Sequence, residues 1–455
     1  MDEIDTKVKS NYWLKSGIIN ILQNITAVLF AMGGFIFLVR VLEEHEYGSW
    51  GLFMGTATIL NIARDSLIKN TLVKFLSAAD EVDKPNIMTS ALVINILITI
   101  ICIVINTSIA IPLSKYWEEP QLVNVFYVFN IVYILNGILT QFNAIEQANL
   151  NFKGVFISNF VNQGLLFAYI FICYIFHFKL PLLHLVFIQI IGALFSNVVS
   201  YRFVKDNLIF AKKISKEWVK KLFDYGKYSF GTSISSILSG TIDKSMLGGM
   251  VNTVAAGAYD IVIRIINLVD IPTNAMATIV FPQSAKRIDS EGKDAIKYLY
   301  ERSVGAILAI LLPGVIFLFL FADIVIFILA DGKFPESASM LKVTIIYIVV
   351  LPYGRQFGAI LDSIGKTKIT FYMVMFISAF NLTLNYFLIK EYGFIGAPYA
   401  TLIANIVGFI IAQIILKREL NVNPINPFIY AYHFYPEMYK KFVQPTLFKI
   451  MKKKS

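Results

Sequence analysis

Long, continuous apolar runs dominate this sequence of 455 residues. Each run is about 20 residues long, the length that an α-helix needs to cross the hydrocarbon core of a bilayer. Strands of a membrane barrel would instead alternate apolar and polar residues over about ten positions. The composition agrees, with 57% hydrophobic residues, 15% charged residues and a mean hydropathy of +0.66. The sequence therefore predicts an all-α integral membrane protein.

The pattern of apolar runs predicts about twelve transmembrane helices. We place them at residues 16–38, 49–71, 87–111, 121–142, 155–176, 183–203, 226–248, 252–281, 303–329, 338–360, 367–389 and 395–416. An even number of spans puts both termini on the same side of the membrane. When alternate loops are assigned to the two sides, thirty Lys and Arg residues fall on the side of the termini and five on the other. The positive-inside rule therefore predicts that both termini are cytoplasmic.

The runs form two groups of six, which predicts two six-helix lobes at residues 1–204 and 226–416. A basic cytoplasmic connection at 205–225 would join them, and a basic cytoplasmic tail would follow at 417–455. In the connection, Ile214, Trp218 and Leu222 share one helix face while the lysines lie elsewhere, as in a helix lying on anionic membrane lipids. A solvated basic linker is the alternative. Because acidic residues precede the first apolar run and no cleavage site follows, we expect no removed signal peptide.

Charged residues inside the predicted spans are the strongest functional signal. Asp243, Lys244, Asp260 and Arg264 lie in two consecutive spans, where a charge is costly unless it faces protein or water. Asp260 and Arg264 are four residues apart, so they share a helix face and can form an ion pair. Such a pair can be purely structural.

Depth along the spans places cations at both ends of a possible path. At 1.5 Å per residue, Lys244 and Arg264 lie toward the outer leaflet, and Arg64 and Arg355 lie toward the inner leaflet. Asp243 and Asp260 are candidate acidic residues for coupling to a gradient of H+ or Na+. Amide pairs such as Asn381/Asn385 would either bond neighbouring helices or line a polar cavity.

The sequence lacks the common signatures of catalysis and of metal binding. It contains no Walker loop, no GxGxxG and no HExxH, and its four histidines are scattered. Cys102 and Cys173 lie in separate apolar runs without CxxC spacing. We therefore expect a transporter rather than an enzyme, with no catalytic residue, no metal site and no cofactor. No nucleic-acid interface is indicated either, since the basic residues mark one membrane face.

Several segments, in order and spacing, resemble one family of membrane proteins. They include FLVRVLEEHEYGSWGLFMG, KYSFGTSISSILSGTIDKSMLGGM and NLTLNYFLIKEYGFIGAPYATLIANIVG. They look like the Wzx-type polysaccharide-biosynthesis flippases of the MOP exporter superfamily, and the resemblance runs from about Asn11 to Leu416. It implies two lobes around a cationic cavity, as in MATE-like transporters. It also implies alternating-access transfer of undecaprenyl-diphosphate-linked oligosaccharide, such as O-antigen repeat units for lipopolysaccharide, to the outer leaflet of the bacterial inner membrane.

The implied cargo suggests roles for the intramembrane cations. A diphosphate needs cationic partners, and Arg can hold it through two parallel hydrogen bonds. The candidate substrate-binding residues are therefore Arg64, Lys244, Arg264 and Arg355. They are chosen by charge and depth in this sequence rather than by a family motif. The polysaccharide polymerase machinery is an expected partner.

Two other functions remain open from the sequence. A multidrug or cation antiporter of the same superfamily would share the fold, and its intramembrane acids could bind cations. A membrane polysaccharide polymerase is less favoured, because the predicted outer loops have about ten residues or fewer and leave no room for catalytic groups.

Overall fold

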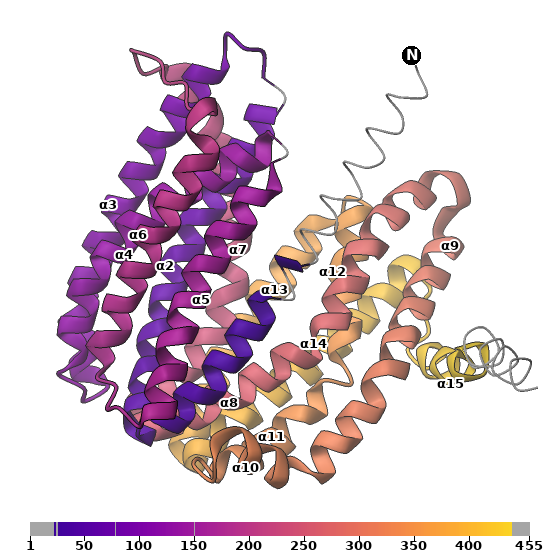
Figure 1. Ribbon diagram of the computed structural model, residues 1–455. Coiled ribbons are helices and arrows are strands. Elements are labelled where there is room, and N and C mark those ends of the chain that lie inside the picture. Colours follow the sequence, from indigo (N-terminus) through magenta and orange to yellow (C-terminus); the bar gives the residue numbers. More distant parts are fainter. Residues whose placement is uncertain (1–21, 24–25, 78, 150, 439–455) are drawn as a thin grey trace, which may run out of the picture. The chain divides into compact units, whose positions relative to one another are not determined.

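The computed structural model describes residues 22–23, 26–77, 79–149 and 151–438, apart from the side chains of residues 70, 228–240, 282, 285, 289, 437 and 438. Every regular element in these ranges is a helix, which confirms the predicted all-α class. The chain divides into two compact units (Figure 1). One comprises Met1–Thr241, Asn252–Gly257 and Leu329–Asp331, and the other Ile242–Val251, Ala258–Ile328 and Gly332–Ser455. The predicted lobes with a connection at 205–225 stay a prediction.

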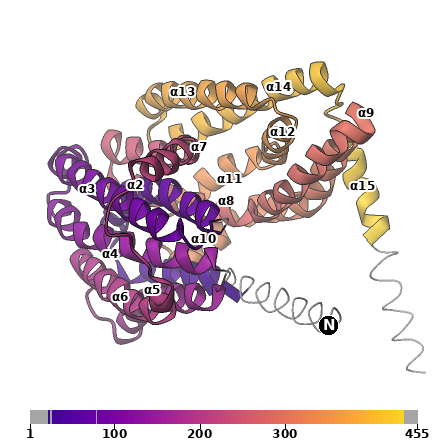
Figure 2. The same cartoon turned by 90° about the horizontal axis from the view of Figure 1, so that it is seen from above.

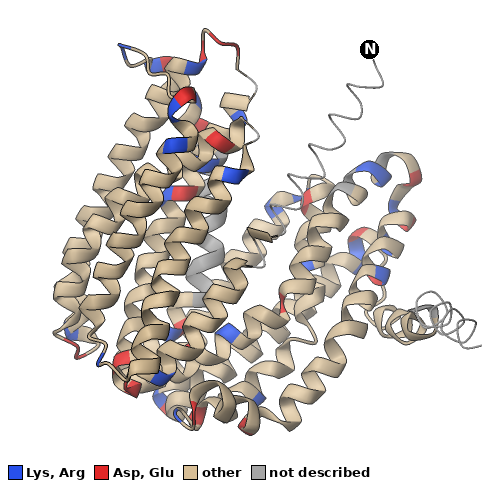
Figure 3. Ribbon diagram, in the orientation of Figure 1, with Lys and Arg blue, Asp and Glu red and all other residues tan. Residues whose placement is uncertain are grey.

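The N-terminal unit is built around five long helices. They are α2 (Glu44–Ser77), α3 (Lys84–Tyr116), α4 (Leu122–Ala148), α5 (Phe152–Phe176) and α6 (Leu182–Val204), followed by the short 3-10 helix η1 (Lys205–Asn207). Helix α4 packs against α2, α3 and α6, and α5 packs against α6 (Figures 1 and 2). The charged residues of α3 to α6 lie at the helix ends (Figure 3), as expected of helices whose middle turns face hydrocarbon.

The C-terminal unit contains more broken helices. It begins with the last turns of α7 (Lys216–Met250). The helices that follow are α8 (Thr253–Val269), α9 (Ile271–Leu320), α10 (Ala322–Ala330), α11 (Glu336–Tyr347), α12 (Leu351–Ser363), α13 (Thr367–Tyr392), η2 (Gly393–Ile395), α14 (Gly396–Leu420) and α15 (Asn426–Met438). Helix α9 packs against α12 and α15, and α13 packs against α14. Gly292 interrupts α9 with a φ of 76°, a left-handed conformation that glycine adopts without strain.

Each predicted span from 49–71 onward coincides with one described helix or with two consecutive ones. The first predicted span is described only in part, as the helix Thr26–Val41. Among the described residues, six helical segments are long and apolar enough to cross a membrane. Helices α11 and α12, bent by 45°, make a seventh if they form one span. Helices α2 and α7 have the required length but carry charged residues within it, such as Arg64 and Asp243.

Each unit has its own apolar core. In the N-terminal unit, the rings of Phe126 and Phe129 both meet Phe53 edge-on, with centroids 5.0 Å apart, and fix α4 against α2. In the C-terminal unit, Tyr300, Tyr353 and Leu416 bring α9, α12 and α14 together.

The segment predicted to lie on the membrane surface packs partly on protein. Helix α7 begins at Lys216 and continues without a break into the seventh predicted span. Trp218 meets Phe75 of α2 edge-on, and Leu222 is buried in the core of the N-terminal unit. Ile214 is exposed, as are the five lysines of the segment: Lys212, Lys213, Lys216, Lys220 and Lys221. The apolar face of this segment therefore anchors it to α2 and leaves the lysines outside.

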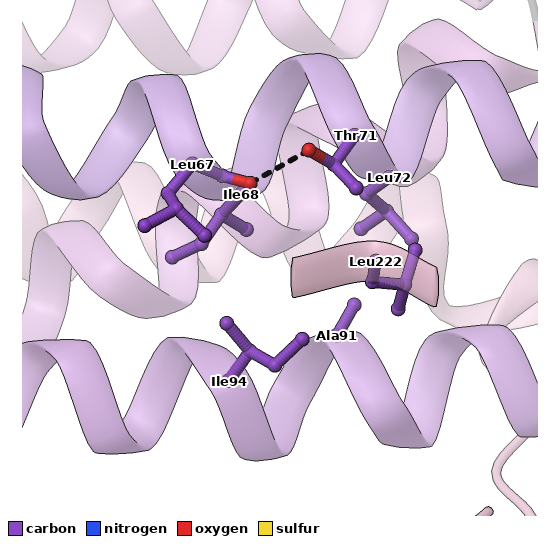
Figure 4. A pocket seen from close by; sticks show the side chains of 7 residues that line it. All are labelled: Leu67, Ile68, Thr71, Leu72, Ala91, Ile94 and Leu222. Atoms are coloured by element: carbon purple, nitrogen blue, oxygen red, sulfur yellow. Dashed lines mark hydrogen bonds between the residues drawn. The ribbon is translucent and has the colours of Figure 1, made fainter. Parts of the chain in front are cut away.

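A small apolar pocket lies at the same place. It is lined by Leu67, Ile68, Thr71, Leu72, Ala91, Ile94 and Leu222 (Figure 4). The one hydroxyl among them, that of Thr71, donates a hydrogen bond of 2.8 Å to the carbonyl oxygen of Leu67 within α2. With no charged side chain in its wall, this pocket is not a site for an anionic headgroup.

Candidate functional site

Three of the charged residues singled out in the sequence meet in the C-terminal unit. Lys244 Nζ lies 2.8 Å from Asp260 Oδ1, and Arg264 Nε lies 2.8 Å from Asp260 Oδ2. The side chains of Lys244 and Asp260 are 12% and 9% exposed, whereas that of Arg264 is 37% exposed. The predicted i,i+4 pair is therefore present, but α7 adds a second cation to it. Two cations on one carboxylate leave the cluster with one net positive charge.

Asp243, next to Lys244 in sequence, has a different environment. Its carboxylate accepts hydrogen bonds from Thr401 Oγ1 at 2.6 Å, Asn385 Nδ2 at 2.8 Å and the Tyr259 hydroxyl at 3.2 Å. Asp243 is 3% exposed, and no Lys or Arg of the described residues forms an ion pair with it. A buried carboxylate held by neutral donors gains stability from a proton or a small cation.

A second ion pair in this unit joins α12 to the bend before α9. Arg355 Nη2 lies 2.9 Å from Asp270 Oδ2, and Asn274 Nδ2 donates to the same oxygen at 2.9 Å. The side chain of Asp270 is 7% exposed and that of Arg355 is 46% exposed. Like Arg264, Arg355 is oriented by a buried carboxylate and keeps a large accessible surface.

Arg64 lies in the N-terminal unit and is 1% exposed. Its Nη1 donates to the carbonyl oxygen of Tyr133 at 2.8 Å, and its Nε and Nη2 donate to Asp65 Oδ1 at 3.1 and 2.9 Å. Thr140 also donates to Asp65 Oδ1, at 3.0 Å. Arg64 therefore joins α2 to α4 within the N-terminal unit.

The surroundings of Asp243 were only partly visible in the sequence. The spacing of Asn381 and Asn385 places both amides on one face of α13, and both are buried in the structure. Their partner could not be predicted, because Asp243 and Asn385 are 142 residues apart in the chain. Thr401 and Tyr259 carried no sequence signal of a site.

Comparison with known proteins places the chain in a family. The model of the polysaccharide biosynthesis protein family matches residues 37–339, more than half of the sequence. The chain belongs to the polysaccharide biosynthesis protein family. The resemblance found in the sequence is thereby confirmed at the level of the family.

This chain is similar to several curated membrane proteins, of which two illustrate the range. An uncharacterized membrane protein, MJ1068 of Methanocaldococcus jannaschii, is 24% identical over 305 residues, which is 66% of this chain but only 59% of that protein. AglR of Haloferax volcanii, named a probable flippase, is 21% identical over 86% of this chain and 81% of its own length. The match to AglR therefore extends over most of both proteins.

The fold is also shared with solved transporter structures. One, titled as the inward-facing conformation of a multidrug resistance MATE family transporter of the MOP superfamily, aligns with a TM-score of 0.72. The alignment covers 86% of this chain and 94% of that one, at 15% sequence identity. The predicted MATE-like membrane fold is confirmed by this likeness, which at such low identity concerns the fold alone.

Proposed function

We propose that this polysaccharide biosynthesis protein is a flippase that moves a lipid-linked oligosaccharide between the leaflets of a membrane. Membership of the family and the extended similarity to AglR support this proposal. More specifically, we propose that the cargo is the one expected from the sequence, an undecaprenyl-diphosphate-linked repeat unit of the O-antigen type. We also propose that the protein lies in the bacterial plasma membrane with both termini in the cytoplasm.

The observation that carries the proposal is that Arg264 and Arg355 are each paired with a carboxylate and yet remain exposed. Each guanidinium is oriented by a buried carboxylate, and each keeps more than a third of its side-chain surface exposed. Guanidinium groups held in this way suit a phosphate or diphosphate, because they can form charge-assisted, two-pronged hydrogen bonds. We assign these two arginines to headgroup binding, with Lys244 as a partly buried supporting charge and Arg64 as a residue that positions α2 and α4.

A multidrug or cation antiporter is the runner-up, because a solved transporter of that kind shares the fold. A cationic drug would be attracted by acids rather than by arginines. In the C-terminal unit Asp260 and Asp270 are each engaged by a cation of the protein. The accessible charges of these two clusters are therefore positive, which favours an anionic cargo.

Transport of a fluorescent lipid-diphosphate oligosaccharide by the purified protein in vesicles tests the proposal. We expect Arg264→Gln and Arg355→Gln each to reduce the rate by about 10- to 100-fold, which corresponds to the roughly 1.5–3 kcal/mol of a hydrogen bond to a charged group. Arg→Lys at the same positions should retain part of the rate. Lys342→Gln is the matched control, because Lys342 is also partly exposed but pairs with the exposed Asp323. Wild-type rates in both Gln variants, or transport of a cationic dye in place of the lipid, would contradict the assignment.

We further propose that Asp243 couples transport to a gradient of H+ or Na+. Its carboxylate is surrounded by oxygen and amide groups from α8, α13 and α14, and among the described residues the titratable group that touches it is Tyr259. Asp243→Asn keeps the shape and removes the charge. We expect this variant to bind cargo but to lose the acceleration that an imposed ion or pH gradient gives the wild type. An unchanged response to both gradients would exclude Asp243 as the coupling residue.

Alternating access around one cavity remains the proposed mechanism. The second and eighth predicted spans approach each other at Gly48 and Thr253, both in the N-terminal unit, and we expect these ends to face outward. A Cβ on Gly48 of α2 would lie 1.9 Å from the carbonyl oxygen of Thr253 at the start of α8. Gly48 is needed for this approach. Cysteine pairs that join residues around Gly48 to residues around Thr253 should block transport when oxidised and restore it on reduction, whereas transport by the cross-linked protein would refute the mechanism.

The proposed partners include anionic lipids and the polymerase machinery. Five exposed lysines surround the anchored start of α7, which suits a surface of negatively charged headgroups. Replacing them with Gln should weaken the dependence of transport on anionic lipid without changing the rate at high anionic content.

A further inference from the structure

Helix α15 follows the last predicted span and has an unusual composition. Its 13 residues, NPFIYAYHFYPEM, contain one charged side chain, that of Glu437. At 1.5 Å per residue the helix is about 20 Å long, too short to cross a hydrocarbon core of about 30 Å. It is therefore an apolar helix that cannot be a span.

One face of α15 packs tightly on α9. Pro427 and Ala431 are buried and Tyr430 and Phe434 are partly buried, at the i, i+3, i+4 and i+7 spacing of a single helix face. A Cβ on Gly305 of α9 would lie 2.6 Å from Tyr430 Cβ and 2.7 Å from the carbonyl oxygen of Pro427. The two helices can approach this closely only because residue 305 has no side chain.

Polar contacts fix α15 on α9 at two points. Glu301 of α9 is 2% exposed, and its two carboxylate oxygens accept hydrogen bonds of 2.8 Å from the Asn423 backbone N–H and from Asn426 Nδ2. A carboxylate at the N-terminus of a helix also interacts favourably with the helix dipole. Near the other end, the Tyr435 hydroxyl donates to the carbonyl oxygen of Ala309 at 2.6 Å. The direction of α15 is thus set by α9.

The opposite face of α15 is apolar and exposed. It carries Phe428, Ile429 and Tyr432, of which Tyr432 is 73% exposed, and the exposed Ile425 directly precedes the helix. A contiguous apolar surface of this kind marks a binding face, and tyrosine is enriched where a protein meets the membrane–water interface. The sequence that follows, residues 439–455, contains six lysines and no acidic residue. Aromatic side chains beside a dense positive charge match the interface of an anionic leaflet.

We propose that α15 is an interfacial helix whose exposed face inserts into the headgroup region of an anionic leaflet, while the lysines after it bind the lipid phosphates. The contacts of α15 with Gly305 and of its N-terminal end with Glu301 would then set the depth of α9 relative to that leaflet. The inference rests on the proposed membrane placement of the C-terminus, but not on the cargo or on transport.

Quenching of a site-specific fluorophore in the full-length protein tests the inference. A nitrobenzoxadiazole label is attached at Tyr432→Cys, or at Ile429→Cys if the first variant fails to fold, in a Cys102→Ala, Cys173→Ala background. Lys293→Cys, on an exposed part of α9, is the water-facing control. The protein is reconstituted in vesicles of phosphatidylcholine with or without phosphatidylglycerol. Quenching is measured with aqueous iodide and with a lipid that carries a shallow nitroxide.

In the anionic vesicles the label at residue 432 should be quenched by the nitroxide lipid and shielded several-fold from iodide relative to residue 293. Removal of phosphatidylglycerol, or replacement of Lys452, Lys453 and Lys454 with Gln, should weaken the shielding. Iodide quenching equal to that of the control would overturn the insertion. A label shielded from both quenchers would show that a second copy of the chain covers this face, and equal shielding in the two lipid mixtures would overturn the role of the lysines. None of these outcomes depends on whether the protein flips lipids.

Discussion

Removing the carboxylate of Asp260 is the most informative perturbation of the buried charge cluster. The change Asp260→Asn leaves Lys244 and Arg264 without their shared anion. Breaking a buried ion pair by removing one partner costs about 3–5 kcal/mol, because the remaining charge stays desolvated. Lys244, whose side chain is 12% exposed, is subject to this penalty, whereas Arg264 is 37% exposed and can be hydrated in place. We therefore expect Asp260→Asn to lower the free energy of unfolding by about 3 kcal/mol or more, a factor of over a hundred in the unfolding equilibrium.

The geometry predicts which second change restores stability. Lys244→Met combined with Asp260→Asn removes both poorly exposed charges, and the loss should fall to about 1 kcal/mol, the scale of an exposed ion pair. Arg264→Gln combined with Asp260→Asn leaves Lys244 without its anion, so the loss in the free energy of unfolding should stay near that of the single variant. Had the pair of Asp260 and Arg264 been isolated, as the sequence alone suggested, the second combination would have been the one that restores stability.

Equilibrium unfolding in mixed micelles, with SDS as the denaturant and far-UV circular dichroism as the signal, measures these differences. Lys342→Met is a suitable control, since it removes a lysine from an exposed ion pair with Asp323. Equal restoration by Lys244→Met and Arg264→Gln would refute the reasoning. So would a loss below about 1 kcal/mol in the Asp260→Asn variant, because the cluster would then behave as a solvated surface pair.

Two glycine positions give further predictions. Gly154→Ala places a Cβ 2.0 Å from the buried carboxylate of Glu146, so we expect it to lower the free energy of unfolding by about 1–3 kcal/mol in the same assay. Adding Glu146→Ala should partly relieve this loss. Gly164→Ala on the same helix is the control and should be harmless, because the nearest atom to its Cβ would lie at 3.6 Å. Gly305→Ala should displace α15 from α9 and expose the chain after Leu420 to limited proteolysis. Gly314→Ala is the control and should have no such effect, because its Cβ would meet nothing within 4 Å. Equal cleavage of the two variants would contradict the packing of α15 on Gly305.

Much of the fold could be predicted from local sequence. Apolar runs long enough to span a bilayer must be helical, because lipid offers no partner for a backbone N–H or C=O group. The breaks within spans were harder to see. The eighth predicted span, 252–281, is divided at Asp270 into α8 and α9, and the tenth, 338–360, is bent between α11 and α12. Helix α15 was missed because a mostly apolar stretch of 13 residues that contains two prolines, Pro427 and Pro436, carries no signal of a span.

The sequence by itself determined the membrane class, the approximate positions of the long apolar helical segments and the shared face of Asp260 and Arg264, because these depend on composition and on the 3.6-residue period of a single helix. Only the tertiary structure decided what each charge touches. Lys244 reaches Asp260 from another helix, and Asp243, its neighbour in sequence, points instead to Asn385 and Thr401, which are 142 and 158 residues away. Likewise, Arg64 is 1% exposed whereas the side chain of Arg355 is 46% exposed, although the sequence predicted a similar depth for both. Exposure and pairing depend on how helices distant in the chain pack together, and the period of one helix carries no information about that packing.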